Sequence, residues 1–392
     1  MLLSLYIILV ISIAVPLLSY VWFPLFLKLK TASKKEHISS DLAAYNACPP
    51  VTIIFSAFNE AAVIERKLQS IIDSDYPKEK LRVLIGSDAS TDTTCTIIER
   101  FTESYPWITL YKNTQRQGKL NVINDLVDKA TTDLLILTDA NVFFEPQTVK
   151  ALVYYLTERK AQQVCANIFK FSPKNAGISG QEIFYMNMEN RIKYEESLAY
   201  GFVVGVEGGC YGIRKDWFTK VPEGFLMDDF FITLSVVERG GKVLFAPEAV
   251  CYEDVNDEPL IEYKRKIRIS LGNYRNLAYY KHLLFPFWKG FGLAFLMHKV
   301  LRWFTPFALI ISFLCCLAIS FYVPVFGWLC LLYSLLLILP LLTIILNKAS
   351  IRLPVVNFAG HFLLMNFALL QGFFKYIFDS GESAWEPPKR NV

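Results

Sequence analysis

The chain has 392 residues, of which 53% are hydrophobic, and its formal net charge is +4. This length suffices for one large or two ordinary domains, but the hydrophobic share is too high for an ordinary soluble protein. The mild charge gives no reason to expect nucleic acid as a partner. The eight cysteines contain no C-x-x-C pair, which argues against a zinc site and a disulfide framework and favours a reducing compartment.

The first apolar segment, residues 1–27, contains no charged side chain and is long enough to span a membrane. It lacks the basic start and the small-residue cleavage site of a signal peptide, so we expect a retained anchor over residues 1–28. Four lysines follow it directly: Lys28, Lys30, Lys34 and Lys35. By the positive-inside rule, they place the residues after the anchor in the cytoplasm.

Between residues 45 and 275, β-branched apolar runs alternate with helical patterns. The expected strands are 51–56, 81–86, 107–111 and a fourth that begins at Leu134, and the expected helices are 61–74, 93–105 and 120–129. Strands that alternate with helices of this length predict a parallel sheet with right-handed crossovers. Ligands of such a sheet bind beyond the carboxyl ends of its strands.

Polar clusters follow three of the four expected strands. The first is residues 56–60, which include Ser56, Asn59 and Glu60. The second is Asp88 with Asp92, and the third is Asp139 with Asn141. One such cluster is ordinary turn chemistry, but three at one edge of a sheet suggest a nucleotide site. The sequence contains no G-x-G-x-x-G and no Walker A motif, which argues against dinucleotide and ATP sites of those kinds.

Asp139 and Asn141 end a buried apolar run at spacing i, i+2, so alternation along the chain lets both face one ligand. Their oxygens are hard ligands, suited to Mg²⁺ or Mn²⁺. An ion held by one or two protein groups normally completes its shell with substrate phosphates. For this pair alone, a turn or a helix cap is the alternative. Lys119 follows Gly118 at a helix start, where it can reach a phosphate or remain solvated.

A glycine-rich turn over residues 208–212 can let a ligand approach the backbone, or it can be a plain bend. Further on, Asp228 and Asp229 lie in apolar surroundings. Burial and mutual repulsion would raise the pKa of at least one of them, which suits a general base. The alternative is a helix N-cap followed by a first-turn acid, because residues 230–239 have a helical pattern. Both interpretations can hold at once.

Residues 276–303 mix aromatic side chains with lysines and an arginine, a composition suited to interfacial amphipathic helices. Two uncharged spans follow, near 304–322 and 325–346. The last apolar segment, 355–378, carries polar side chains, and both a third crossing and a re-entrant segment stay open. The expected division is an anchor (1–28), an α/β domain (45–275), interfacial helices (276–303), a C-terminal transmembrane region (304–378) and a tail (379–392).

In this order the motifs resemble the inverting glycosyltransferases of family 2, which include cellulose, chitin, hyaluronan and poly-N-acetylglucosamine synthases. The resemblance spans roughly residues 50 to 280 and extends to the membrane layout. The matching motifs are Ser56-Ala-Phe-Asn-Glu60, Asp88 with Thr91-Asp92, Gly118-Lys119, Asp139-Ala-Asn141 in the place of D-x-D, Gly208-Gly-Cys-Tyr-Gly-Ile-Arg214, and Asp228-Asp229 in the place of the base motif. The resemblance implies a GT-A fold and a nucleotide-sugar donor, with a UDP-sugar expected.

The resemblance also implies a role for each matching residue. Asp88 would contact the nucleotide, Asp139 the Mg²⁺ or Mn²⁺ on the diphosphate, and Asp229, beside Asp228, would be the general base. The other expected site residues are Asn141 for the metal; Ser56, Asn59, Glu60, Asp92, Lys119, Arg265 and Arg268 for the donor; and Gly209, Cys210 and Tyr211 for the acceptor. The chemistry would be a single in-line displacement with inversion, in which the metal stabilises the departing diphosphate.

Processive members of this family carry Q-x-x-R-W, whose tryptophan stacks on the acceptor sugar. The matching run here has Arg265 in the place of Gln, keeps Arg268 and has Ile269 in the place of Trp. An aliphatic side chain offers no flat face to a pyranose, so we expect short products. Attraction to an anionic membrane surface is a further role for this basic run.

Together these observations predict a glycosyltransferase of the inner or plasma membrane, with its catalytic domain in the cytoplasm. It would transfer a hexosyl or N-acetylhexosaminyl group to a glycan or lipid-linked acceptor, in the synthesis of surface polysaccharide or glycolipid. A non-catalytic nucleotide-sugar-binding or secretion scaffold is the alternative, but the presence of both Asp139 and Asp229 counts against it. A transporter would need charged side chains in its spans, and residues 303–346 contain none.

Overall fold

The computed structural model describes residues 1–34, 38–171, 179–254, 259–348 and 353–378. The chain forms two compact units. The α/β unit comprises Thr31–Pro173 and Ile183–Asn256, and the helical unit comprises Met1–Lys30, Lys174–Glu182 and Asp257–Gly381. The expected tail, residues 379–392, lies outside the described residues.

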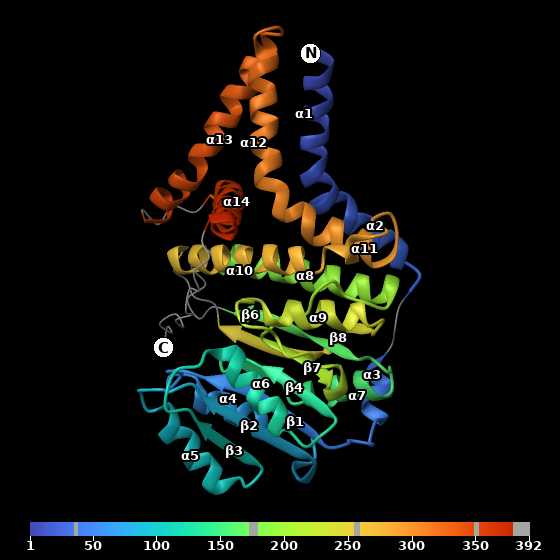
Figure 1. Cartoon of the computed structure of the whole chain (residues 1–392), viewed down its shortest axis with the longest axis vertical. Coiled ribbons are helices and arrows are strands. Elements are labelled where there is room, and N and C mark those ends of the chain that lie inside the picture. The colour runs from blue at the N-terminus through green and yellow to red at the C-terminus, as the bar shows by residue number, and fades with distance from the viewer. Residues whose placement is uncertain (35–37, 172–178, 255–258, 349–352, 379–392) are drawn as a thin grey trace. The chain divides into compact units, whose positions relative to one another are not determined.

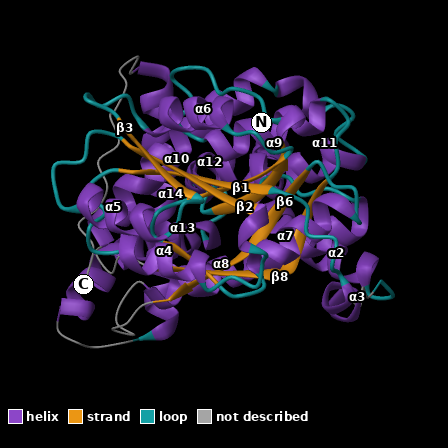
Figure 2. Ribbon diagram, turned by 90° about the horizontal axis from the view of Figure 1, so that it is seen from below, coloured by secondary structure: helices purple, strands orange, loops and turns teal. Residues whose placement is uncertain are grey.

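The α/β unit is built on a sheet whose eight described strands run in the order β3-β2-β1-β4-β7-β6-β8-β5. Figure 2 shows these strands as one twisted layer among helices. The strands are β1 (Val51–Ala57), β2 (Leu81–Ser87), β3 (Ile108–Lys112), β4 (Leu134–Thr138), β5 (Val142–Phe144), β6 (Gln163–Phe171), β7 (Cys210–Arg214) and β8 (Val243–Asp254). The four strands expected from the sequence are therefore present, and β3, β2, β1 and β4 pair in parallel.

The expectation of a wholly parallel sheet is wrong for the second half. Strand β7 pairs antiparallel with both β4 and β6, and β5 pairs antiparallel with β8. After β4 the chain turns at once into β5. It later returns beside β4 as β7, which runs in the direction opposite to β4. This arrangement brings the start of β7 against the carboxyl end of β4, with Cys210 opposite Thr138.

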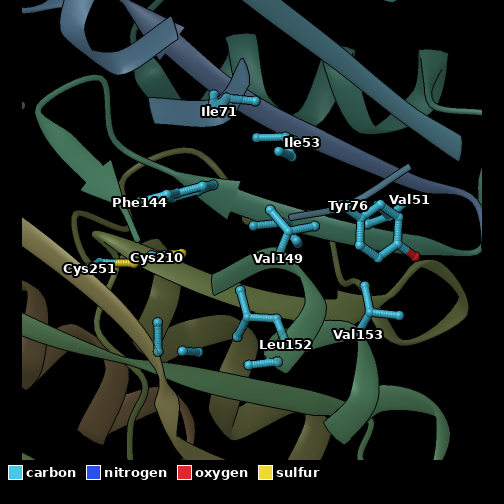
Figure 3. Packing of buried hydrophobic residues seen from close by; sticks show 14 of the residues in the cluster. Val51, Ile53, Ile71, Tyr76, Phe144, Val149, Leu152, Val153, Cys210 and Cys251 are labelled. Atoms are coloured by element: carbon cyan, nitrogen blue, oxygen red, sulfur yellow. The ribbon is translucent and has the colours of Figure 1, made fainter. Parts of the chain in front are cut away.

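The helices of the α/β unit follow from apolar spacing. In α4 (Ile64–Ile72), the buried residues Ile64, Lys67, Leu68 and Ile71 recur at the i, i+3, i+4, i+7 spacing of one helical face. The others are α3 (Ile38–Ala44), α5 (Thr94–Ser104), α6 (Lys119–Lys129), α7 (Thr148–Thr157), α8 (Ser179–Tyr200) and α9 (Asp228–Glu238). Figure 3 shows part of the core, where residues of α7 such as Val149 and Leu152 pack with strand residues such as Ile53.

The helical unit contains long apolar helices, and α1 lies beside α12 (Figure 1). Its α-helices are α1 (Leu2–Leu17), α2 (Phe23–Thr31), α10 (Pro259–Tyr279), α11 (Gly290–Phe295), α12 (Leu301–Ser320), α13 (Val325–Lys348) and α14 (Pro354–Phe378). Single π-helical turns join α1 to α2 (Leu18–Trp22) and α11 to α12 (Leu296–Val300). Among the described residues, four helical runs are long and apolar enough to cross a membrane: Leu2–Thr31, Gly290–Ser320, Val325–Thr343 and Val355–Phe378.

The boundary expected at residues 303 and 304 falls inside the continuous run Gly290–Ser320. His298 and Arg302 lie in this run and are buried within the helical unit, with the Arg302 guanidinium 4.9 Å from the ring centre of Tyr20. From the sequence alone, the polarity of these two side chains suggests that they lie among the lipid headgroups. Packing between α12 and the α1–α2 segment instead buries them, so polarity alone does not mark where this helix begins.

Candidate active site

The loop after β1 is tied to the loop after β2 through backbone N–H groups. The Asn59 Oδ1 accepts a hydrogen bond of 2.8 Å from the backbone N–H of Thr91. The two oxygens of Asp92 accept hydrogen bonds from the backbone N–H groups of Ala61 (3.1 Å) and Thr94 (3.0 Å). Partial burial opposes ionisation of Asp92, but these hydrogen bonds outweigh it and lower its pKa. Asn59 and Asp92 therefore shape this edge of the site.

Two further donor-site candidates lie in the same region. Glu60 is buried, and its backbone N–H donates to the Thr94 Oγ1 at 2.9 Å. Ser56 lies near the end of β1 and is partly exposed. The structure thus brings Ser56, Asn59, Glu60 and Asp92 to one edge of the sheet, as their sequence positions suggest.

Asp88 holds the loop that leads into α6. Its Oδ1 accepts a hydrogen bond from the backbone N–H of Gln117 (2.7 Å), and its Oδ2 accepts one from Gly118 (3.1 Å). The Nε of Arg116 lies 3.7 Å from the same Oδ2. Gly118 has a φ of +83°, a conformation that favours glycine. The buried carboxylate therefore fixes the start of α6 and, with it, the position of Lys119.

Lys119 and Asp139 form an ion pair beyond the carboxyl end of β4. The Lys119 Nζ lies 2.6 Å from the Asp139 Oδ1, and each side chain is about one-third exposed. Burial lowers the pKa of Lys119, but the charges of Asp139 and Asp228 outweigh that effect and raise it above its ordinary value. The ammonium group thus stays charged and contacts the carboxylate of Asp139, which is the expected metal ligand.

The expected strand alternation does not extend from Asp139 to Asn141, because β4 ends at Thr138 and the chain then turns. The role of Asn141 as a metal ligand stays a prediction. The backbone N–H of Val142 donates to the Asp139 carbonyl at 3.3 Å, which closes the turn, and Asn141 is buried. The exposed Asp139 carboxylate fits a divalent cation. No group of three or more His, Cys, Asp or Glu within the described part of the chain can hold a metal. An ion here would therefore need oxygens of a ligand to complete its shell.

The turn before β7 lies against both Asp139 and Asp229. The Gly209 carbonyl accepts hydrogen bonds from the Asp139 backbone N–H (3.0 Å) and from the Thr138 Oγ1 (2.8 Å). A Cβ at Gly208 would lie 3.0 Å from the Asp229 Oδ2, so a side chain there would displace the carboxylate. A larger residue at this position would require the Asp229 carboxylate to shift by a few tenths of an ångström.

Cys210 and Tyr211, two of the expected acceptor-site residues, are buried side chains of β7, between β4 and β6. Figure 3 shows Cys210 next to Cys251 within the core. The Tyr211 hydroxyl has no hydrogen-bond partner among the residues that the structure describes. Burial raises the pKa of Tyr211, and the charges of Asp228, Asp229 and Asp139 raise it further. Gly208 and Gly209, which precede Cys210 and Tyr211, are partly exposed.

Asp229 is a buried carboxylate in the first turn of α9. Its Oδ1 accepts a hydrogen bond from the backbone N–H of Phe230 at 2.8 Å. Burial, then the charges of Asp228 and Glu207, raise the pKa of Asp229 to about 7. The N-cap interpretation of Asp228 is not supported, because Met227 occupies that position and both acids lie inside the helix. Asp229 therefore combines burial with a pKa near neutrality, as a general base requires.

Sequence reasoning missed a buried ion pair beside Asp229. The Lys193 ammonium group, on α8, is fully buried and contacts the Glu207 carboxylate, which is one-third exposed. Burial lowers the pKa of Lys193, but the charge of Glu207 outweighs it and raises that pKa. The one sequence feature that points to this ion pair is the position of Glu207, directly before the glycine pair of the 208–212 turn.

The remaining two candidates, Arg265 and Arg268, lie on α10 of the helical unit. The Arg265 guanidinium contacts the Glu262 carboxylate at 3.5 Å. Their participation in the donor site stays a prediction.

Residues 52–221 match the family model "Glycosyl transferase family 2". This stretch contains the ends of β1, β2 and β4, and the turn before β7. This match, which spans less than half of the chain, supports a family 2 glycosyltransferase. The resemblance seen in the sequence motifs is thereby confirmed.

Curated relatives are similar to this chain over about half of its length. It is 24% identical over 239 residues to the probable glycosyltransferase YdaM of Bacillus subtilis (strain 168), covering 57% of this chain and 55% of that protein. It is 27% identical over 222 residues to the dolichyl N-acetyl-alpha-D-glucosaminyl phosphate 3-beta-D-2,3-diacetamido-2,3-dideoxy-beta-D-glucuronosyltransferase of Methanococcus voltae, covering 51% of this chain and 65% of that protein. The matched regions thus span less than two thirds of either relative.

A solved structure is similar over nearly the whole chain. It is the mannosyltransferase PcManGT from Pyrobaculum calidifontis, in complex with GDP-Man and Mn²⁺, with a TM-score of 0.69 and 21% identity over 95% of this chain and 100% of that chain. At this identity the likeness establishes the fold. It confirms the expected fold class, a GT-A α/β domain with additional long apolar helices.

Proposed function

We propose that this family 2 chain is a membrane-bound inverting glycosyltransferase that moves a sugar from a nucleotide-diphosphate donor to a glycan or lipid-linked acceptor. The observation that carries this proposal is the carboxylate of Asp229, buried and with a pKa of about 7. It lies close enough to Asp228 and Lys119 to interact electrostatically with both. A mere nucleotide-sugar sensor has no use for such a base.

In this mechanism Asp229 takes the proton of the acceptor hydroxyl as the acceptor oxygen forms its bond to the anomeric carbon. The bond from that carbon to the diphosphate oxygen breaks on the opposite side, and the nucleoside diphosphate leaves. The Lys119 ammonium group, held beside Asp139 at 2.6 Å, can neutralise charge that develops on the leaving group. A bound Mg²⁺ or Mn²⁺ would act as a Lewis acid on the diphosphate, with Asp139 as its protein ligand.

The family resemblance favours a UDP-sugar, with a hexosyl or N-acetylhexosaminyl group. The similar mannosyltransferase has GDP-Man bound, so both nucleotides belong in the test. The product is proposed to be short or extended by a single sugar, because Ile269 on α10 replaces the stacking tryptophan of processive members. Product sizing by mass spectrometry would detect a long polymer, which would contradict this part of the proposal.

The proposed location is the inner or plasma membrane, with the α/β unit in the cytoplasm. Four described helical runs are long and apolar enough to cross a membrane. Lys28 and Lys30 lie in the last turn of α2, at the end of the first of these runs. The positive-inside rule supports a cytoplasmic location for the residues that follow. We retain the division into an anchor (1–28), a catalytic domain (45–275), interfacial helices (276–303), a C-terminal transmembrane region (304–378) and a tail (379–392) as part of this proposal.

The decisive experiment supplies UDP- and GDP-sugars to membranes that contain the full chain and measures release of the nucleoside diphosphate at varied Mn²⁺ and Mg²⁺. Membranes with Asp229→Asn are the matched control. We expect release from the unmodified protein with one donor and a divalent ion, and inverted configuration at the new glycosidic bond by NMR. Binding of a donor without any transfer would instead support the non-catalytic scaffold.

A further inference from the structure

Lys67 is a fully buried lysine on the apolar face of α4, and it belongs to none of the sequence motifs described above. It lies three residues after Ile64 and four before Ile71, both of which belong to the hydrophobic core. A buried ammonium group loses its hydration, and an apolar side chain of similar length would avoid that cost. Lysine at this position therefore calls for a function other than filling the core.

The Lys67 ammonium group donates hydrogen bonds to both ends of the Asp139 turn. One acceptor is the Thr138 Oγ1, at 2.9 Å, and the other is the Val142 carbonyl. Thr138 is the last residue of β4 and Val142 the first of β5, so only residues 139–141 lie between them. The same ammonium group lies 3.9 Å from the ring centre of Phe144, which Figure 3 shows near Cys210 and Cys251.

These contacts continue to the backbone of Asp139 itself. The Thr138 Oγ1, which accepts from Lys67, donates in turn to the Gly209 carbonyl at 2.8 Å. That carbonyl also accepts the hydrogen bond from the Asp139 backbone N–H, at 3.0 Å. Lys67 is thus connected to the Asp139 backbone through three successive hydrogen bonds on one side and through the closed turn at Val142 on the other.

We propose that Lys67 is a positioning residue, which holds the 139–141 turn so that the Asp139 carboxylate points at the cation on the donor diphosphate. This inference rests on the proposed function, because it assumes that Asp139 binds a cation together with the diphosphate. Lys67 does not touch the substrate. It acts on the ligand through the groups that orient it, and changes at such outer positions typically alter metal affinity by 10- to 100-fold.

The variant Lys67→Met separates positioning from simple charge effects, because the two predict opposite signs. By Coulomb's law alone, removing a positive charge near Asp139 would tighten the binding of a divalent cation. Loss of the turn's anchor would weaken it. With the full chain in lipid nanodiscs and with UDP or GDP present, we expect about tenfold weaker Mn²⁺ binding, measured as free Mn²⁺ by electron paramagnetic resonance.

Two controls distinguish this role from a purely structural one. Leu68→Ala removes a fully buried side chain from the same helix and should lower thermal stability without changing the Mn²⁺ affinity of the folded protein. Thr138→Val removes one acceptor of the Lys67 ammonium group and should copy Lys67→Met. Thr138→Ser keeps the hydroxyl and should retain the Mn²⁺ affinity of the unmodified protein. Hydrogen exchange at residues 139–142 should speed up in Lys67→Met and Thr138→Val only.

The outcomes are separable from those of the proposed function. If the unmodified protein binds no Mn²⁺ with either nucleotide, the metal part of the proposed function fails, and the role of Lys67 fails with it. If the unmodified protein binds Mn²⁺ and both Lys67→Met and Thr138→Val bind it equally well or more tightly, the positioning role is overturned while the proposed function stands. Should Lys67→Met fail to fold, the two Thr138 variants decide between these results.

Discussion

The loops after β1 and β2 form one region that carries carboxylates, and the end of β4 with the start of α9 forms another, but the two regions stabilise their carboxylates differently. Asp88 and Asp92 accept hydrogen bonds from backbone N–H groups of neighbouring loops. Asp139 and Asp229 interact mainly with Lys119 and with other acidic side chains, although Asp229 also accepts one hydrogen bond from the Phe230 backbone N–H. Backbone hydrogen bonds make the first region a preformed support. In the second, charge is left available for a reaction, at the cost of a buried acid whose pKa is raised.

The largest expected effect is that of Asp139→Ala. A bound divalent ion contributes several kcal/mol to the stabilisation of a leaving diphosphate, so we expect a loss of turnover of about 10³-fold or more. Donor affinity, measured by isothermal titration calorimetry, should fall only when a divalent ion is present. Full activity of this variant, or metal-independent activity of the unmodified protein, would show that Asp139 does not bind an ion needed for the reaction.

Asp229→Asn should reduce transfer by at least about 10²-fold, the usual contribution of a general base. Because the change keeps the size of the side chain, donor binding should stay nearly intact. Asp228→Asn is the matched control and should cost less. Initial rates at saturating donor would rank the two variants, and the opposite ranking would assign the base to Asp228.

Asp88→Asn tests the supporting region and should have a smaller effect of another kind. The variant replaces one acceptor of the two loop hydrogen bonds by a donor, which should disturb the start of α6 and displace Lys119. Hydrogen bonds to a charged group typically contribute about 1.5–3 kcal/mol, so we expect KM for the donor to rise by about tenfold or more. A fall in kcat with an unchanged KM would show that Asp88 acts in the chemical step.

The contributions of Asp229 and Asp92 to stability should change in opposite directions with pH, which distinguishes the two regions. Because Asp229 must be ionised to accept a proton, kcat/KM should rise with pH, by about tenfold per unit below a pKa of about 7, and level off above it. Stability should change in the opposite direction. The pKa of Asp229 is raised from 3.8 to about 7 in the folded protein, so its contribution to stability is present below pH 3.8 and is lost as the pH rises through about 7.

Asp92 provides the contrast for that measurement, because its folded-state pKa is lowered from 3.8. Its contribution to stability is therefore present above pH 3.8 and is lost as the pH falls through its folded pKa. In thermal unfolding followed by circular dichroism, Asp229→Asn should gain stability relative to the unmodified protein at pH 8 but not at pH 4. An equal difference at both pH values would show that Asp229 is not the group with the raised pKa.

Sequence patterns located the first half of the sheet well, because its strands are local apolar runs between recognisable turns. Strand β1 was expected at 51–56 and is Val51–Ala57, and β4 begins at Leu134 as expected. The second half depends on pairing between distant segments: β7 pairs with β4 across more than 70 residues of chain. No local period encodes that pairing, so the antiparallel strands were missed.

The site shows the same limit. The chemical types at Asp139 and Asp229 marked them as candidates, but the turn that buries Asn141 depends on the pairing of β5 with β8. Lys67 illustrates the converse. Its helical spacing with Ile64 and Ile71 predicts burial, yet only the folded structure shows that its partners are the two ends of the Asp139 turn. Spacing can therefore locate a buried charge, but its partners come from tertiary contacts.

The ion pair between Lys119 and Asp139 has a consequence for the order in which ligands bind. A divalent ion that approaches Asp139 must compete with a cation that belongs to the protein itself, since the Lys119 Nζ rests 2.6 Å from the carboxylate. In the proposed function, a bound diphosphate would offer Lys119 an alternative anion and would release the carboxylate for the metal. Metal and donor would then be thermodynamically linked, each increasing the affinity for the other. In the absence of donor the protein would retain a metal only weakly, and the nucleoside diphosphate and the ion would leave together.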